Sequence, residues 1–342
     1  MAARADMSAT SEPIPVDPAP GVELDQAPVR LTALIVALVV AILVVVLQNV
    51  LIDREFPHLM RLTTDFSPAY LEREIRSMKG TRAVVFLGDS VLWGYRLPAD
   101  QNAVSLLAAR GCTCRNLSFK SGNPPNAYAL ERLMLAWSVV PRAVVIEVNQ
   151  SVFNPADMEY QTLHPAIAAL AAPLLSRRDL ARLTLPPAPA PAEQRLDGTL
   201  ASVSELYAMR ADIRETLYGD VQPSPIPNLT GDMFEGTYNL VPLDESNVGV
   251  HFLERAADLL QRRHVELVAF LTPTNHALLH DYIDNRQYRA NEAYLARLLE
   301  RRGARVLDLD HAFPTGEFFD NAHLTAAGQR RLASLLAQAL RH

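Results

Sequence analysis

The sequence contains a serine, an aspartate and a histidine whose setting suits acyl transfer. Ser90 follows the apolar run 84–87 and precedes a helix-compatible stretch, so its hydroxyl is expected where a strand turns into a helix. A serine hydroxyl is a poor nucleophile at neutral pH until a base takes its proton. Asp320 and His323 offer that base together with a carboxylate to orient it. We therefore predict a catalytic triad of these three residues.

These residues resemble the SGNH or GDSL-type hydrolase family. Its first block is similar to 88–94, where Ser90 matches the nucleophile and its N–H matches one oxyanion donor. Its second block is similar to 116–123, which makes the N–H of Gly122 the implied second donor. Its last block, Asp-x-x-His, is met at 320–323. The resemblance covers roughly residues 80–125, 142–155 and 264–342.

The third block of the family is an apolar strand that ends in Gly-x-Asn-Asp. Here the run 143–148 leads into Asn149, which the resemblance makes the side-chain donor of the oxyanion hole. The chain departs from the pattern at two positions, with Glu147 in place of the glycine and Gln150 in place of the aspartate. Asn154 is the reserve candidate if the strand ends later than residue 148.

Other readings of the same residues are weighed beside this one. The Gly-x-Ser-x-Gly elbow of α/β-hydrolases is absent, because Leu92 occupies its final glycine position. A lone serine after a strand is usually a helix cap, and an isolated Asp-x-x-His is usually a cap with a surface histidine. Asn275 and His276 leave the end of another predicted strand and are substrate-binding candidates. A structural histidine is the main alternative for His276.

A second strong feature is the apolar stretch 31–52. About 22 residues in a helix reach roughly 33 Å, which is enough to cross the hydrocarbon core of a bilayer. Residues 31–47 carry no charge, and the polar 53–55 that follow do not look like a signal-peptide cleavage site. We expect a retained transmembrane helix.

The flanking charges do not orient this helix, because two arginines lie on each side of it: Arg4 and Arg30 before, Arg54 and Arg61 after. A short tail, one span and a large domain form a signal-anchor layout. Anchored members of the resembled family also commonly act on envelope polymers. Both points favour a globular domain outside the cytoplasm, in the periplasm.

Composition agrees with a membrane-anchored globular protein. The 342 residues are 49% hydrophobic, which provides enough apolar material for a large core. The net charge is −6, so the chain has no basic field that would attract nucleic acid. Cys112 and Cys114 are too close in sequence for a metal site, so they are either structural thiols or a strained bridge. We expect neither a metal nor a cofactor.

The pattern along the chain predicts a disordered tail over 1–30, a stalk over 53–80 and a hydrolase-like domain over 81–342. An insertion at about 155–250 is expected to hold helices and to be either a lid or a surface decoration. Strands alternate with helices, which indicates a three-layer, flavodoxin-like parallel sheet with helices on both faces. The strands are predicted over 83–88, 143–148, 265–272 and 305–309, and the helices over 70–79, 91–110, 126–138, 165–175, 200–218, 252–263, 290–302 and 326–341.

These observations predict a membrane-anchored serine esterase or O-acyltransferase. Its expected substrates are acyl esters, above all acetyl esters, of an envelope or exported polysaccharide. A membrane-bound protein is a possible acyl donor, since hydrolysis and transfer share one acyl-enzyme. Two alternatives stay open: a non-catalytic binding or scaffolding protein of an envelope polysaccharide assembly, which the departures in the third block favour, and a phospholipase or lipase.

Overall fold

The computed structural model describes most of the chain beyond residue 26. The described residues are 27–55, 61–62, 66–155, 161–185, 192, 195–196, 198–200, 204–208, 210, 228–238 and 240–341. They divide into two units, residues 1–46 and 47–342. The tail expected over 1–30 lies outside the described residues up to residue 26.

The first unit contains most of a single long helix, α1 (Ala27–Glu55). Between Leu31 and Gln48 all side chains except those of Thr32 and Gln48 are apolar, and none is buried by protein. A helix satisfies its own backbone hydrogen bonds, which is what a segment needs in lipid. By length and composition α1 is long enough to span a membrane, and it begins before the predicted residue 31.

The second unit is built on a parallel sheet with strand order β2-β1-β3-β4-β5. Every neighbouring pair is parallel, for example with Phe86 opposite Asn116 and Leu87 opposite Ile146. This is the order of flavodoxin-like folds, whose ligands bind beyond the carboxyl ends of β1 and β3. The strands are β1 (Val84–Leu87), β2 (Cys114–Asn116), β3 (Ala143–Val148), β4 (Glu266–Leu271) and β5 (Arg305–Asp308).

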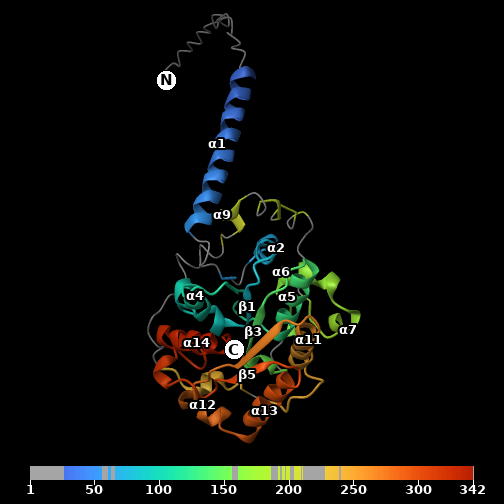
Figure 1. Cartoon of the computed structure of the whole chain (residues 1–342). Helices are drawn as coiled ribbons and strands as arrows, with labels where there is room; N and C mark the ends of the chain where they lie inside the picture. Colours follow the sequence, from blue (N-terminus) through green and yellow to red (C-terminus); the bar gives the residue numbers. More distant parts are fainter. Residues whose placement is uncertain are drawn as a thin grey trace, which may run out of the picture. The chain divides into compact units, whose positions relative to one another are not determined.

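Helices cover both faces of the sheet, as Figure 1 shows, so the predicted three-layer fold is confirmed. Successive strand residues point to opposite faces: Val85 and Val144 join one apolar core, whereas Phe86 and Val145 join the other. The first core is covered by α2 (Pro68–Ser77), α5 (Pro124–Ala136), α6 (Pro165–Ala171), α11 (Val248–Arg262) and α13 (Arg286–Glu300). The second is covered by α3 (Ser90–Trp93), α4 (Ala103–Ala108) and α14 (Ala326–Ala339).

Two local predictions are wrong. The helix expected over 91–110 is broken into α3 and α4, because Gly94 ends α3 in the left-handed conformation (φ 81°) and Pro98 follows soon after. The short strand β2 was not predicted, since only three residues of it pair with β1. Its first residue, Cys114, forms a disulfide with Cys112.

The segment predicted as a stalk differs from that expectation in its second half. Ser67 caps α2 by accepting a hydrogen bond from the N–H of Tyr70. Leu62, Leu71 and Ile75 are buried in the same core as β1 and α5. The chain therefore belongs to the globular unit by residue 61.

The insertion is described only in part. It contains α6, α7 (Arg177–Leu180) and α9 (Glu205–Ala208). The helix expected over 200–218 lies mostly outside the described residues. The two helices α12 (His276–Ile283) and α13 follow β4 and lead back to β5.

Candidate active site

Ser90 lies directly beyond the carboxyl end of β1, as the first residue of α3. Asp89 caps this short helix through a hydrogen bond of 2.9 Å from the N–H of Val91. The N–H groups of Asp89 and Leu92 both donate to the carboxyl of Glu147, at 3.0 and 3.2 Å. Among the described residues, only the Ser90 N–H of this turn has no partner, so it is available to a developing oxyanion.

The structure brings Ser90, His323 and Asp320 together. The His323 Nε2 atom lies 2.7 Å from the Ser90 Oγ, and its Nδ1 atom lies 2.8 Å from an Asp320 carboxylate oxygen. A carboxylate only accepts, so Nδ1 carries the proton and Nε2 is left to accept the serine proton. This is the geometry of a nucleophile, a base and an orienting acid.

Asp320 is held in its charged form. It is 6% exposed, and burial alone would raise its pKa. Hydrogen bonds and charge from His323, together with the N–H groups of His323 and Ala322, outweigh burial and lower the pKa of Asp320 below its usual value. The side-chain amide of Asn275 also donates to the Asp320 backbone carbonyl at 2.9 Å. The candidate Asn275 therefore supports the loop that carries Asp320, which we call the acid loop.

The other predicted oxyanion donors are close to this turn but are already bonded. The Gly122 N–H donates to the Phe119 carbonyl at 3.0 Å, and a Cβ on Gly122 would meet the Gly88 carbonyl oxygen, so this loop packs against the nucleophile turn. The Asn149 amide donates to the Asp89 carboxylate at 2.8 Å. The amide has two protons, so one stays available for an oxyanion. Their roles stay predictions.

The departure at Glu147 has a structural explanation. A Cβ on Gly88 would lie 2.5 Å from a Glu147 carboxyl oxygen, so the missing side chain at residue 88 makes room for this carboxyl beneath the nucleophile turn. The carboxyl also accepts a hydrogen bond from the Thr272 hydroxyl at 3.3 Å. Burial, and then the neighbouring Asp89 charge, raise the pKa of Glu147 well above its usual value.

The remaining third-block residues are buried and structural in their contacts. The Gln150 side chain donates to the Tyr288 carbonyl at 3.2 Å. The Asn154 side chain donates to the Gly236 carbonyl at 2.8 Å and so holds part of the insertion. Neither is brought to Ser90 by any hydrogen bond among the described residues.

His276 belongs to a second histidine–aspartate pair at the same edge of the sheet. Its Nε2 lies 2.6 Å from an Asp310 oxygen, and the Tyr288 hydroxyl donates to the other oxygen at 2.7 Å. The His311 ring stacks on His276 with centroids 3.7 Å apart. Nearby, burial and then the charges of Asp310 and Asp308 raise the pKa of Glu292 to about 8.

Three further residues support the triad and were not expected from the sequence. The Tyr95 ring lies 4.4 Å from the His323 ring, centroid to centroid. Gln329 on α14 donates to the Val91 carbonyl at 2.7 Å and so ties the helix after His323 to the helix after β1. Arg61 donates to three carbonyls just beyond Ser90, at 2.8 to 3.0 Å: those of Trp93, Gly94 and Leu97. No local motif marks these contacts, because each joins segments far apart in sequence.

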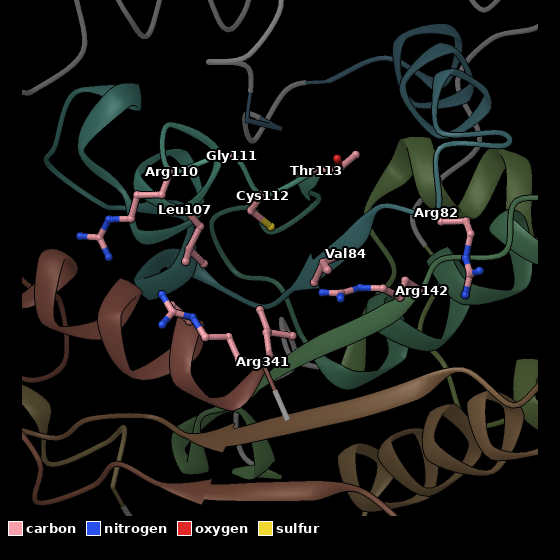
Figure 2. Close-up of a pocket in the computed structure, with 11 residues that line it drawn as sticks. Arg82, Val84, Leu107, Arg110, Gly111, Cys112, Thr113, Arg142 and Arg341 are labelled. Atoms are coloured by element: carbon pink, nitrogen blue, oxygen red, sulfur yellow. The ribbon is translucent and has the colours of Figure 1, made fainter.

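A pocket of about 540 Å³ lies at the opposite, amino-terminal edge of the sheet. Figure 2 shows four exposed arginines around it, Arg82, Arg110, Arg142 and Arg341, near Val84 at the start of β1. The strands run parallel, so this pocket and the triad lie at opposite ends of β1. It takes no part in the proposed chemistry.

The chain has only distant likenesses to known proteins. One family model matches residues 245–342, less than half of the chain, and its description names no activity. No curated protein matches the sequence. Among solved structures, a protein of Desulfitobacterium hafniense described as a lipolytic member of the G-D-S-L family is similar at 11% identity with a TM-score of 0.38, over 75% of this chain and 98% of that one. A protein of Bacteroides fragilis described as an acylhydrolase is similar at 12% identity with a TM-score of 0.40, over 80% and 96%. Both likenesses are weak, so the proposal below rests on the geometry of the site.

Proposed function

We propose that this protein is a membrane-anchored serine esterase or O-acyltransferase of the SGNH type. One observation carries the proposal: the Ser90 hydroxyl is 2.7 Å from the His323 Nε2, while Asp320 holds the other ring nitrogen at 2.8 Å. A nucleophile within hydrogen-bond reach of a base that a third group orients is the signature of covalent acyl transfer.

The reaction follows from these contacts. The Ser90 oxygen attacks the ester carbonyl carbon while its proton passes to the His323 Nε2. The negative charge moves to the carbonyl oxygen, where the Ser90 N–H and the proposed donors Gly122 and Asn149 stabilise it. His323 then gives the proton to the leaving alkoxide, and the acyl group stays on the serine. Water or a sugar hydroxyl, deprotonated by His323, attacks this acyl-enzyme and releases Ser90.

The buried Glu147 carboxyl supports this mechanism. It binds two N–H groups of the turn that carries Ser90, at 3.0 and 3.2 Å, and it fixes their direction. Burial and then the Asp89 charge raise the pKa of Glu147, which disfavours a second negative charge that would oppose a developing oxyanion. The departure from the family pattern is therefore compatible with catalysis and does not by itself favour the scaffolding alternative.

The proposed substrate is an acetyl or other short acyl ester of an envelope or exported polysaccharide. This choice rests on the resemblance of the first and last blocks to anchored members of the family. For transfer, an acyl donor is also needed, and we propose a membrane-bound protein in this role. Hydrolysis and transfer are distinguished by adding a sugar acceptor and measuring how the released acyl group is divided between water and the sugar.

The domain is proposed to lie outside the cytoplasm. The disulfide between Cys112 and Cys114 supports this, because disulfides persist in oxidising compartments such as the periplasm. A reporter that is active only outside the cytoplasm, fused after His342, should be active, and the uncleaved chain should fractionate with membranes. Recovery of the full-length chain in the soluble fraction would argue against the anchor.

The direct test uses the full chain in detergent with an aryl acetate and a fluorophosphonate probe. The wild-type protein should turn over the ester and be labelled, and Ser90→Ala should do neither while keeping its melting temperature. Ser77→Ala is the matched control, since among the described residues this exposed hydroxyl bonds only to the Glu74 carbonyl. Labelling of Ser90→Ala would refute the nucleophile, and an inert wild-type protein would favour the scaffolding role. A preference for long-chain glycerolipids would favour the phospholipase alternative.

A further inference from the structure

Three ligand atoms suited to a transition metal converge beyond the carboxyl ends of β4 and β5. They belong to His276, the first residue of α12, and to Asp310 and His311, which follow β5. All three atoms lie within 4.8 Å of one another. The Asp310 Oδ2 atom lies 2.6 Å from the His276 Nε2 atom and 3.4 Å from the His311 Nε2 atom.

The charge balance at this place calls for a cation. Asp310 is only 1% exposed, and a buried carboxylate is costly unless a positive group pairs with it. No arginine or lysine forms an ion pair with it among the described residues. Asp308, whose carboxylate accepts a hydrogen bond from the Asp310 N–H at 3.2 Å, adds a second negative charge nearby. The two histidines are the groups that can hold a cation against this carboxylate.

We propose that His276, Asp310 and His311 form a binding site for a divalent transition-metal ion of the zinc class. Two imidazole nitrogens and one carboxylate oxygen are ligands that zinc prefers, and three protein ligands leave a fourth position for water. Ligands of a tetrahedral zinc ion lie about 3.3 Å apart, as bond lengths of about 2.0 Å require. The contact of 3.4 Å fits this spacing, and the hydrogen-bonded contact of 2.6 Å lengthens toward it when the ion replaces the proton.

Binding needs two small adjustments that the structure permits. The ion displaces the proton that His276 now shares with Asp310, and this proton is released to solvent. The stacked His311 ring must turn so that its lone pair points at the ion, and its side chain is 74% exposed and has room to do so. Asp310 needs no movement, because the Tyr288 hydroxyl fixes its second oxygen at 2.7 Å, as outer ligands of metal sites do.

The place of this site in the fold gives it a consequence for the triad. Asn275 precedes the ligand His276, and it bonds the backbone of Asp320 and Asn321 at 2.9 and 2.8 Å. An ion that joins the start of α12 to the end of β5 would hold this support of the acid loop in place. The site is thus proposed to be structural, beside the active site.

The test measures binding and does not depend on esterase activity. The full chain in detergent, purified without a polyhistidine tag and stripped by a chelator, is titrated with Zn²⁺ in competition with a chromophoric chelator. We expect one zinc ion per chain and a melting temperature that rises by several degrees with zinc. His311→Ala removes an exposed ligand without disturbing the core, and it should weaken binding at least tenfold.

His280→Ala is the matched control. Its ring also contacts an aspartate, Asp281 at 3.0 Å, but both side chains are exposed and no third ligand is near among the described residues. It should bind zinc like the wild-type protein. Absence of zinc from the wild-type protein, or equal affinity in wild type and His311→Ala, would overturn the proposal. Either result leaves the esterase assignment untouched.

Discussion

Two histidine–aspartate pairs lie at the carboxyl edge of one sheet, and they differ in which ring nitrogen meets the carboxylate. In the pair His323–Asp320 the carboxylate takes Nδ1 at 2.8 Å, and Nε2 faces Ser90 at 2.7 Å. In the pair His276–Asp310 the carboxylate takes Nε2 at 2.6 Å, and the nearest further groups are a tyrosine hydroxyl and a second imidazole.

The difference shows that the pair alone does not define a base. A carboxylate on Nδ1 leaves the outer nitrogen free to take a proton from a nucleophile. A carboxylate on Nε2 occupies the outer nitrogen, so the ring can be a ligand or a structural group but is poorly placed as a base. Four experiments, in order of decreasing effect, test whether the two pairs divide the work in this way.

The largest contrast is expected between His323→Ala and His276→Ala. Loss of the proposed base should lower kcat/KM for an aryl acetate at least a hundred-thousandfold, which is about 7 kcal/mol of transition-state stabilisation. His276→Ala should lower it less than tenfold. The kinetic constants of both variants are compared with those of His280→Ala, which should match the wild type. Similar losses in the first two variants would contradict the division of roles.

The second-largest difference is expected between the variants of the two aspartates, Asp320 and Asp310. Asp320→Asn keeps the shape of the side chain but favours the wrong tautomer of His323, and the same change in serine proteases costs about 10⁴ in kcat. Asp310→Asn should leave kcat within tenfold and lower the melting temperature and zinc affinity instead. If the two pairs have different roles, kcat should fall mainly in Asp320→Asn and the melting temperature mainly in Asp310→Asn. A large loss of kcat in Asp310→Asn with an unchanged melting temperature would show that both pairs act in catalysis.

The oxyanion donors should serve only the first pair. Asn149→Ala is expected to lower kcat by roughly a hundredfold to a thousandfold with little change in KM, because this bond strengthens mainly in the transition state. Asn154→Ala should lose stability with a near-normal kcat, since its amide holds the Gly236 carbonyl. Normal kcat in both variants would leave the third block without a catalytic role.

The smallest expected effect concerns pH and stability. The pKa of Asp320 is lowered in the folded protein, so ionised Asp320 stabilises the fold above its ordinary pKa of about 3.9. That contribution is lost as the pH falls through the lowered value. The small stability margin of wild type over Asp320→Asn should therefore be present at pH 7 and shrink below pH 4, as denaturant unfolding at both pH values would measure. A margin that grows on acidification would reverse the assigned direction.

The sequence predicted what local patterns determine. The strands β1, β3, β4 and β5 were predicted to within two residues at each end, because each is an apolar run bounded by polar or turn residues. Ser90, Asp320 and His323 could be named because nucleophile and acid–base pair each sit in a short motif next to such an element. β2 is too short to show a pattern, and Gly94 broke a helix whose apolar period continues through it.

Contacts between distant segments could not be predicted. Glu147 looked like a mismatch until its carboxyl was found in the space that Gly88 leaves. The second pair joins residues from two strands' ends, and only the folded chain shows that Asp310 is the partner of His276. Single-sequence reasoning locates candidates along the chain, whereas burial and partners depend on which loops the sheet brings together.

Arg61 connects the segment that follows α1 to the loop beyond Ser90. The Arg61 guanidinium donates to the carbonyls of Trp93 and Gly94, and it lies 3.6 Å from the centroid of the Trp93 ring. In sequence, Arg61 is only a few residues from Glu55, where α1 ends. A shortened protein that begins at residue 81 would lose these contacts, so soluble versions intended for crystallisation or screening should start before Arg61.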